Sequence, residues 1–211
     1  MALVKLNNRG VRSVSTFGSI SSLGTYTFIK KITASSSATV SFVDGSSDVV
    51  LDDTYKEYLF TFNNIHPQTN LLGFLFNGSD DTSSHSYDIA KTTTLFRARH
   101  KEDGSSGEMT YDTSRDMAQG TGSNYLNALL SNDADGSLSG YLYLFDPSNT
   151  TFVKHFIAVT SEMSTYGDST VGPHNIFTGG YFNTTAAITA IQFQMESGNI
   201  DAGDICLYGI N

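Results

Sequence analysis

The carboxylates of loop 132–136 (NDADG) are the residues whose type and spacing come nearest to a metal site. Asp133 and Asp135 stand one residue apart, ahead of a glycine, and two such oxygens can face one hard cation such as Ca²⁺. A full calcium loop would carry a further acidic ligand downstream, whereas Ser and Leu follow here. Asp and Asn also favour tight turns by bonding their own backbone. The segment therefore predicts a turn, with Asp133 and Asp135 as calcium candidates.

Motifs of common enzyme classes are missing from the sequence. No Gly-x-Ser-x-Gly elbow, His-Glu-x-x-His pair or Gly-Lys-Ser/Thr phosphate loop occurs, and the five histidines are scattered without ligand spacing. A polysaccharide hydrolase would need two carboxyl groups about 5–9.5 Å apart. The carboxylates that could form such pairs are Asp133, Asp135, Glu162 and Asp168, all predicted in turn-rich loops. We therefore expect no catalytic residue, no cofactor and no enzymatic activity.

Aromatic side chains raise the alternative of a glycan-binding module. A sugar ring stacks on an exposed aromatic platform, and since the chain has no Trp, only its Tyr residues could provide one. The candidates lie on predicted strands, where packing accounts for them: Tyr26, Tyr141, Tyr143, Tyr181 and Tyr208.

The net charge and the cysteine count exclude several classes of partner and of covalent cross-link. The 12 basic and 21 acidic residues give a net charge of −9, so there is no basic stripe for nucleic acid or for an anionic membrane. Cys206 has no disulfide partner and is predicted to be a small core residue on a strand. The N-terminus lacks the apolar stretch of a secretory signal, and no apolar run approaches the roughly 18 residues of a membrane span. We expect synthesis in a cytoplasm and no membrane contact.

Composition and periodicity predict an all-β chain. The 27 Ser, 24 Thr and 19 Gly suit strands with one wet face and many turns, while 11 Tyr and 14 Phe can fill a core. About nine or ten short alternating strands separated by turn signals indicate an antiparallel β-sandwich, with a jelly roll as first choice. Phe60, Phe74 and Phe193 are expected between the sheets. Residues 141–145 are apolar on both faces, which predicts a strand buried between two layers.

Two kinds of local exception are expected. Residues 34–37 (ASSS) predict a turn between two strands. Tyr125 with Leu129, and Leu126 with Leu130, have the i, i+4 spacing of one or two helical turns, and residues 48–55 offer another turn.

Domain organisation is expected to be simple: an N-terminal arm over residues 1–23 and a single β-sandwich domain over residues 24–211. The arm carries Lys5, Arg9 and Arg12 and no acidic residue, since the first one in the chain is Asp44. A basic segment on an acidic protein is suited to docking on an acidic neighbour. A disordered terminus or a first strand of the sandwich are the alternatives.

Four stretches resemble short structural proteins of the virions of marine tailed bacteriophages. They are residues 5–13 (KLNNRGVRS), 55–67 (YKEYLFTFNNIHP), 149–156 (NTTFVKHF) and the C-terminal run 180–210. The resemblance implies a non-enzymatic virion protein on the tail appendage or fibre, or decorating the capsid. It implies other virion proteins as partners and, because particles repeat their modules, a homo-oligomer, expected to be a trimer. A receptor-recognition module of a tail fibre, binding a host surface glycan, is the alternative.

Overall fold

The computed structural model describes residues 26–165 and 171–210, which form two antiparallel sheets packed face to face. The predicted all-β sandwich is confirmed. Thirteen strands occupy the described ranges, against the nine or ten expected. The same ranges contain no helix, and hence none able to cross a bilayer.

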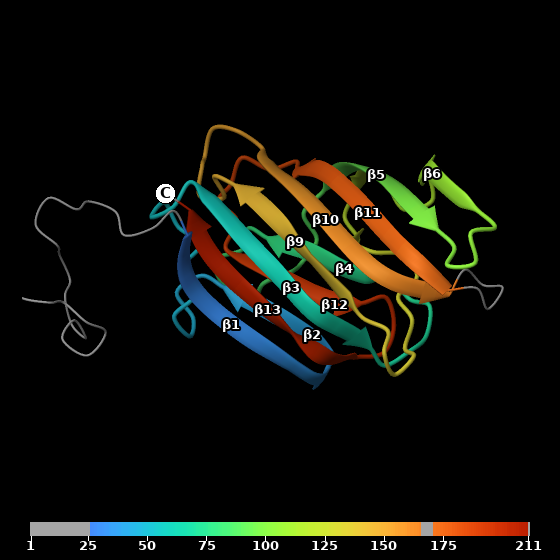
Figure 1. Ribbon diagram of the computed structural model, residues 1–211. Coiled ribbons are helices and arrows are strands. Elements are labelled where there is room, and N and C mark those ends of the chain that lie inside the picture. Colours follow the sequence, from blue (N-terminus) through green and yellow to red (C-terminus); the bar gives the residue numbers. More distant parts are fainter. Residues whose placement is uncertain (1–25, 166–170, 211) are drawn as a thin grey trace, which may run out of the picture.

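The larger sheet has nine strands and the smaller has four. The path of the large sheet is β1 (Tyr26–Ser37), β13 (Ile200–Ile210), β3 (Glu57–Pro67), β9 (Leu138–Phe145), β10 (Lys154–Thr165), β11 (Val171–Phe182), β5 (Lys91–His100) and β6 (Gly107–Tyr111), with β7 (Met117–Gly120) also paired to β5. The small sheet follows the order β2 (Thr39–Val43), β12 (Ala190–Met195), β4 (Phe74–Ser79) and β8 (Asn124–Tyr125). Figure 1 shows the large sheet in front of β2, β12 and β4, with β1 at one edge and β6 at the other.

The chain passes repeatedly between the sheets. β1, β3, β9 and β13 belong to the large sheet, and β2, β4, β8 and β12 to the small one. With the insertions β5–β7 and β10–β11 set aside, the chain changes sheet at every step except from β4 to β8, which are neighbours in the small sheet. The insertions extend the large sheet beyond the small one. They are therefore the strands that widen the outer surface of the molecule.

A cluster of phenylalanines fills the space between the sheets. Phe60, Phe74 and Phe193 are fully buried, as predicted. The Phe193 ring lies 5.2–6.5 Å from five others, those of Phe42, Phe60, Phe62, Phe74 and Phe76. These rings come from β2, β3, β4 and β12, so residues far apart in sequence build one core.

Strand β9 lies at the centre of the large sheet but not between two layers. Leu142 and Leu144 are fully buried in the core. Tyr141 on the opposite face is 38% exposed, and Tyr143 and Phe145 are half-buried. The prediction that both faces are buried is therefore wrong, because described residues cover only one face of the sheet.

The local exceptions are also wrong. β1 continues as strand through Ser37, since Ala34 pairs with Gly203 and Ser35 with Ala202. Residues 126–130 form no helix. Their backbone instead forms hydrogen bonds with the segment that leads into β4. Leu126 N–H donates to Phe74 O, and Leu130 N–H donates to Leu72 O. Residues 48–55 contain no helical turn, only other turns and irregular backbone.

Candidate functional site

The face of the large sheet that points away from the small sheet, called the outer face below, carries the aromatic residues that could bind a partner. All five tyrosines proposed as sugar platforms lie outside the two buried clusters of the core. Tyr26 is 54% exposed, and Tyr143, Tyr181 and Tyr208 are half-buried. Packing in the core therefore does not account for them, contrary to the prediction.

Four of these tyrosines and two phenylalanines lie on the outer face of β1, β13 and β9, and together we call them the tyrosine patch: Tyr26, Phe28, Tyr141, Tyr143, Phe145 and Tyr208. Phe28 packs edge-on against Tyr208 with ring centroids 5.6 Å apart. Tyr143 lies 5.5 Å from Tyr141 and 6.1 Å from Phe145. The hydroxyl groups of Tyr26 and Tyr143 are 3.4 Å apart. The patch therefore consists of two groups of contacting aromatics, one on β1 and β13 and one joining β9 to Tyr26, with Leu59 of β3 in register between Tyr208 and Tyr143.

Strand alternation places the patch on the outer face. Successive side chains of a strand point to opposite faces, so Leu142 and Leu144 in the core require Tyr141, Tyr143 and Phe145 to face outward. The hydrogen bond with Tyr26, together with burial, raises the pKa of Tyr143 to about 12. The Tyr143 hydroxyl is therefore protonated at neutral pH.

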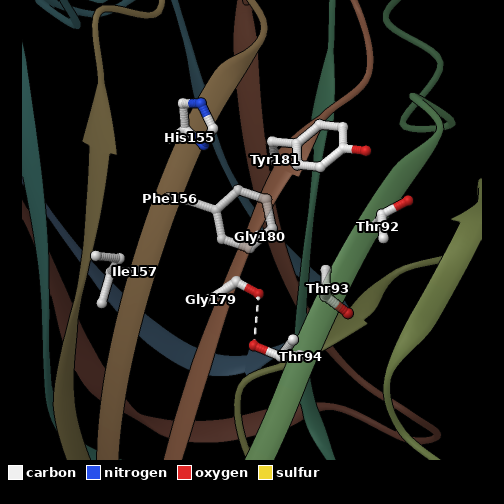
Figure 2. Close-up of a pocket in the computed structure, with 9 residues that line it drawn as sticks. All are labelled: Thr92, Thr93, Thr94, His155, Phe156, Ile157, Gly179, Gly180 and Tyr181. Carbon is white, nitrogen blue, oxygen red and sulfur yellow. Dashed lines mark hydrogen bonds between the residues drawn. The ribbon is translucent and has the colours of Figure 1, made fainter.

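A groove lies on the outer face beside the patch, where β10, β11 and β5 run together. We call this groove the Gly179 groove. The residues that line it, shown in Figure 2, are Thr92, Thr93, Thr94, His155, Phe156, Ile157, Gly179, Gly180 and Tyr181. Its volume is about 450 Å³. Register aligns Ile157 with Gly179 and Gly179 with Thr94, so the groove crosses three strands at one level.

The two glycines of β11 have different roles. A Cβ at Gly180 would lie 2.6 Å from Thr92 O and 3.0 Å from the Phe156 ring, so close packing requires glycine there. A Cβ at Gly179 would meet nothing nearer than Thr94 Oγ1 at 3.8 Å. Packing of the described chain therefore does not require glycine at position 179. Its missing side chain leaves the groove open.

Ring pairs lie on either side of Gly179 along the strands, and one of them, His155 with Tyr181, belongs to the lining of the groove. On one side, Phe96 and Phe177 stack with centroids 4.8 Å apart and planes 8° from parallel. On the other, His155 and Tyr181 lie 5.9 Å apart, edge to face. Phe177 and Tyr181 are four residues apart on β11, a separation of about 13 Å along a strand. Gly179 is midway between them.

Neutral polar groups continue the groove at the Tyr181 end. The hydroxyl of Thr92 accepts a hydrogen bond from Gln119 Nε2 at 2.8 Å. Gln119 Oε1 in turn accepts from Asn183 Nδ2 at 2.7 Å. Both amide side chains are exposed. They provide a rim of donors and acceptors without formal charge.

A second group of titratable residues is buried inside the sandwich, where a substrate would not reach it. Glu162 Oε1 lies 3.0 Å from His174 Nδ1, and Asn127 Nδ2 donates to Glu162 Oε2. Burial raises the pKa of Glu162, and the contact with His174 opposes this shift. Glu162 belongs to β10, so its prediction as a loop carboxylate is wrong. This arrangement is suited to holding strands together.

Lys91 is a buried cation that sequence patterns did not identify. It is fully buried on β5, and its ammonium donates to Ile89 O at 2.9 Å and Gly122 O at 2.6 Å. The ammonium also lies 5.9 Å from the centroid of the Phe182 ring. Burial lowers the pKa of Lys91 to about 8. Only an unusual Lys at an inward position of β5 would have signalled it.

We expect the lowered pKa of Lys91 to appear in the pH dependence of stability. Between pH 8 and 10.5 Lys91 is protonated in the unfolded chain but deprotonated in the folded chain. The free energy of unfolding therefore increases as the pH rises through this range. Relative to Lys91→Met, the wild type should gain up to about 3 kcal/mol across this range. Urea denaturation at several pH values measures the difference, with Lys30→Met on β1 controlling for the loss of one positive charge. A flat difference would contradict the prediction.

The loop with Asp133 and Asp135 is a turn in the structure. The Asp133 carboxylate accepts from Ser131 Oγ at 2.8 Å, and Gly136 N–H donates to Asp133 O at 2.8 Å. Asp135 is exposed. No three His, Cys, Asp or Glu side chains are grouped as a metal site anywhere in residues 26–165 and 171–210.

Other predicted residues lie outside the described ranges or apart from the groove. The docking candidates Lys5, Arg9 and Arg12 and the carboxylate Asp168 are not among the described residues. Cys206 is buried on β13 but paired in register with Lys31 and Thr61, outside the core cluster.

Comparison of the chain with protein-family models, with curated proteins and with solved structures finds no match.

Proposed function

We propose that this protein is a non-enzymatic structural module of a bacteriophage virion, carried on the tail appendage or fibre or on the capsid. The resemblance of residues 5–13, 55–67, 149–156 and 180–210 to short virion proteins is its starting point. The strand order gives support: β1-β13-β3-β9 faces β2-β12-β4-β8, and the chain changes sheet at every step among these eight strands except from β4 to β8. We take this order as that of a jelly roll with two insertions, an architecture used by capsid proteins and lectins.

The tyrosine patch is the observation that carries the proposal. Tyr26 and Phe28 are 54% and 57% exposed, which is a large apolar area for a surface in water. Contiguous exposed apolar surface of this kind marks interaction sites, and Tyr and Phe are enriched in protein interfaces. The aromatic face is therefore suited to permanent contact with protein.

The partner that we assign to the patch is a second copy of the chain, in a homotrimer. A particle repeats its modules by symmetry, so each copy offers the same face to its neighbours. The six aromatic side chains carry no formal charge, and the exposed Glu57 of β3 lies in register with Phe145 at their edge. Attachment to the rest of the virion is assigned to the N-terminal arm, through Lys5, Arg9 and Arg12.

Removing the exposed rings should break the oligomer without unfolding the chain. In the variant Tyr26→Ser/Phe28→Ser/Tyr141→Ser we expect a monomer at micromolar concentration, where the wild type sediments as an oligomer. Sedimentation velocity measures the state, and circular dichroism checks the fold. The matched control changes three exposed apolar residues outside the patch: Met109→Ser, Tyr111→Ser and Phe152→Ser. A monomeric wild type, or an oligomeric patch variant, would contradict the assignment of the patch.

A further inference from the structure

The Gly179 groove has a shape that the virion proposal does not explain. It is open to solvent on the outer face, at the level where Ile157, Gly179 and Thr94 align. Figure 2 shows His155 and Tyr181 at one end and the Thr94 hydroxyl bonded to Gly179 O beneath the opening. Its volume of about 450 Å³ is within the range of small-molecule sites, about 300–1,000 Å³.

We propose that the Gly179 groove binds a neutral saccharide, with one sugar ring lying over Gly179 beside the Tyr181 ring. This inference does not depend on the virion proposal, because it concerns binding by the isolated protein. Three properties of the groove support it: its lack of charge, its flanking rings and its amide rim.

The lining selects an uncharged ligand. The nine residues that line the groove include no Asp, Glu, Lys or Arg. Two buried lysines adjoin the lining in sequence, Lys91 and Lys154, and their ammonium groups donate hydrogen bonds to backbone carbonyls. An anionic sugar would therefore lose hydration in the groove and find no lysine or arginine in the lining to pair with.

The rings match the apolar face of a sugar. A pyranose presents C–H groups on one face and hydroxyl groups around its edge, so it needs an apolar wall and polar neighbours together. Tyr181 is half-buried, and its ring is braced edge-on by His155. Ile157, 52% exposed, provides the opposite wall. Because Gly179 has no side chain, a ring can rest on the backbone between these walls.

The rim supplies the hydrogen bonds. The Thr92 hydroxyl and the exposed amides of Gln119 and Asn183 form a connected chain at the Tyr181 end. Thr94, also exposed, presents a hydroxyl on the other side of Gly179. Hydroxyl and amide groups donate and accept, as sugar hydroxyls do. An apolar side chain from a second copy would leave this rim unused, so we assign the groove to a saccharide.

The decisive variant fills the groove and leaves the core unchanged. In Gly179→Val the new side chain points outward, and its Cβ meets no atom closer than 3.8 Å, so the melting temperature should stay near that of the wild type. Tyr181→Leu removes the stacking ring and keeps an apolar residue on the strand. Asn175→Val is the matched control, since it lies on the same strand and face, outside the groove.

Binding is measured on the purified full chain by saturation-transfer NMR and titration. The probes are glucose, galactose, mannose, N-acetylglucosamine, lactose and maltose, with sialic acid and glucuronic acid as charged competitors. We expect at least one neutral probe to bind the wild type and the Asn175→Val control equally. Its affinity should fall at least about tenfold in Gly179→Val and Tyr181→Leu, a loss easily resolved by titration.

Several results would overturn the proposal. One is that the wild type binds none of the neutral probes, and a second is that it binds only the charged sugars. The third such result is that folded Gly179→Val binds a neutral probe as tightly as the wild type does. If instead Gly179→Val dissociates an oligomer and no sugar binds, the groove belongs to a subunit contact. Failure of sugar binding leaves the patch experiment unaffected, because that experiment measures assembly of variants with an intact groove.

Discussion

Phe193→Ala should lower the free energy of unfolding by about 3–5 kcal/mol, the loss typical of deleting a buried phenyl ring. Phe193 is fully buried at the centre of the ring cluster, and its closest ring, that of Phe62, lies 5.2 Å away. The cavity would open between the sheets, where rings from both sheets would have to move together to close it. For a chain of this size the melting temperature should fall by roughly 10 °C. Urea denaturation and calorimetry measure the two quantities.

Phe152→Ala is the matched control, because Phe152 is 69% exposed on a loop. Its loss should stay within about 0.5 kcal/mol, as for ordinary surface substitutions. Equal losses in the two variants would show that Phe193 is not the centre of a packed core.

Glu162→Ala should be about as destabilising as the loss of Phe193. The side chains of Glu162 and His174 are 1% and 0% exposed. The variant removes the carboxyl group that contacts His174 Nδ1 and accepts from Asn127 Nδ2. Removing one partner of such a buried pair costs about 3–5 kcal/mol. Denaturant unfolding at pH 7 measures the loss.

Glu162→Gln is the informative comparison, since it keeps the volume and one acceptor oxygen but removes the charge. We expect it to retain more stability than Glu162→Ala, because the contacts with His174 and Asn127 can still form in part. A loss below about 1 kcal/mol in Glu162→Ala would contradict the buried pair. Such a small loss would mean that water surrounds the Glu162 carboxylate in the wild type.

The alternating strands and their core residues were predictable from the sequence. Tyr58, Phe60 and Phe62 share one side of β3 and are all fully buried, as period-two spacing requires. Phe193 follows the same rule on β12. Such patterns state which side chains share a face, because that depends only on neighbours along one strand.

The same patterns could not state which faces meet water. Residues 141–145 are apolar at every position, and a central strand of a two-layer sandwich has one face on the core and one outside. Leu142 and Tyr141 are both large and mostly hydrocarbon, yet they are opposite in exposure. Distinguishing them requires the position of the other sheet, which is a long-range property.

The helical turns expected around Tyr125–Leu130 failed for a related reason. The i, i+4 spacing of Leu126 and Leu130 is real, but their N–H groups bind the carbonyls of Phe74 and Leu72, about fifty residues earlier. The N–H groups of a segment can satisfy themselves in a helix or against a neighbouring strand. In this protein they pair with the neighbouring segment instead of forming a helix, and the spacing of residues along the chain does not predict that choice.

The sequence alone therefore determined the strand class, the hydroxyl-rich wet faces and the phenylalanine core, since each depends on composition or on a period of two. Only the tertiary structure decided the tyrosine patch and the Gly179 groove. Thr92, His155 and Tyr181 meet because β5, β10 and β11 pair in one register, His155 with Tyr181 and Tyr181 with Thr92. A shift of one residue in either pairing would turn one set of side chains to the opposite face, and the groove would not form.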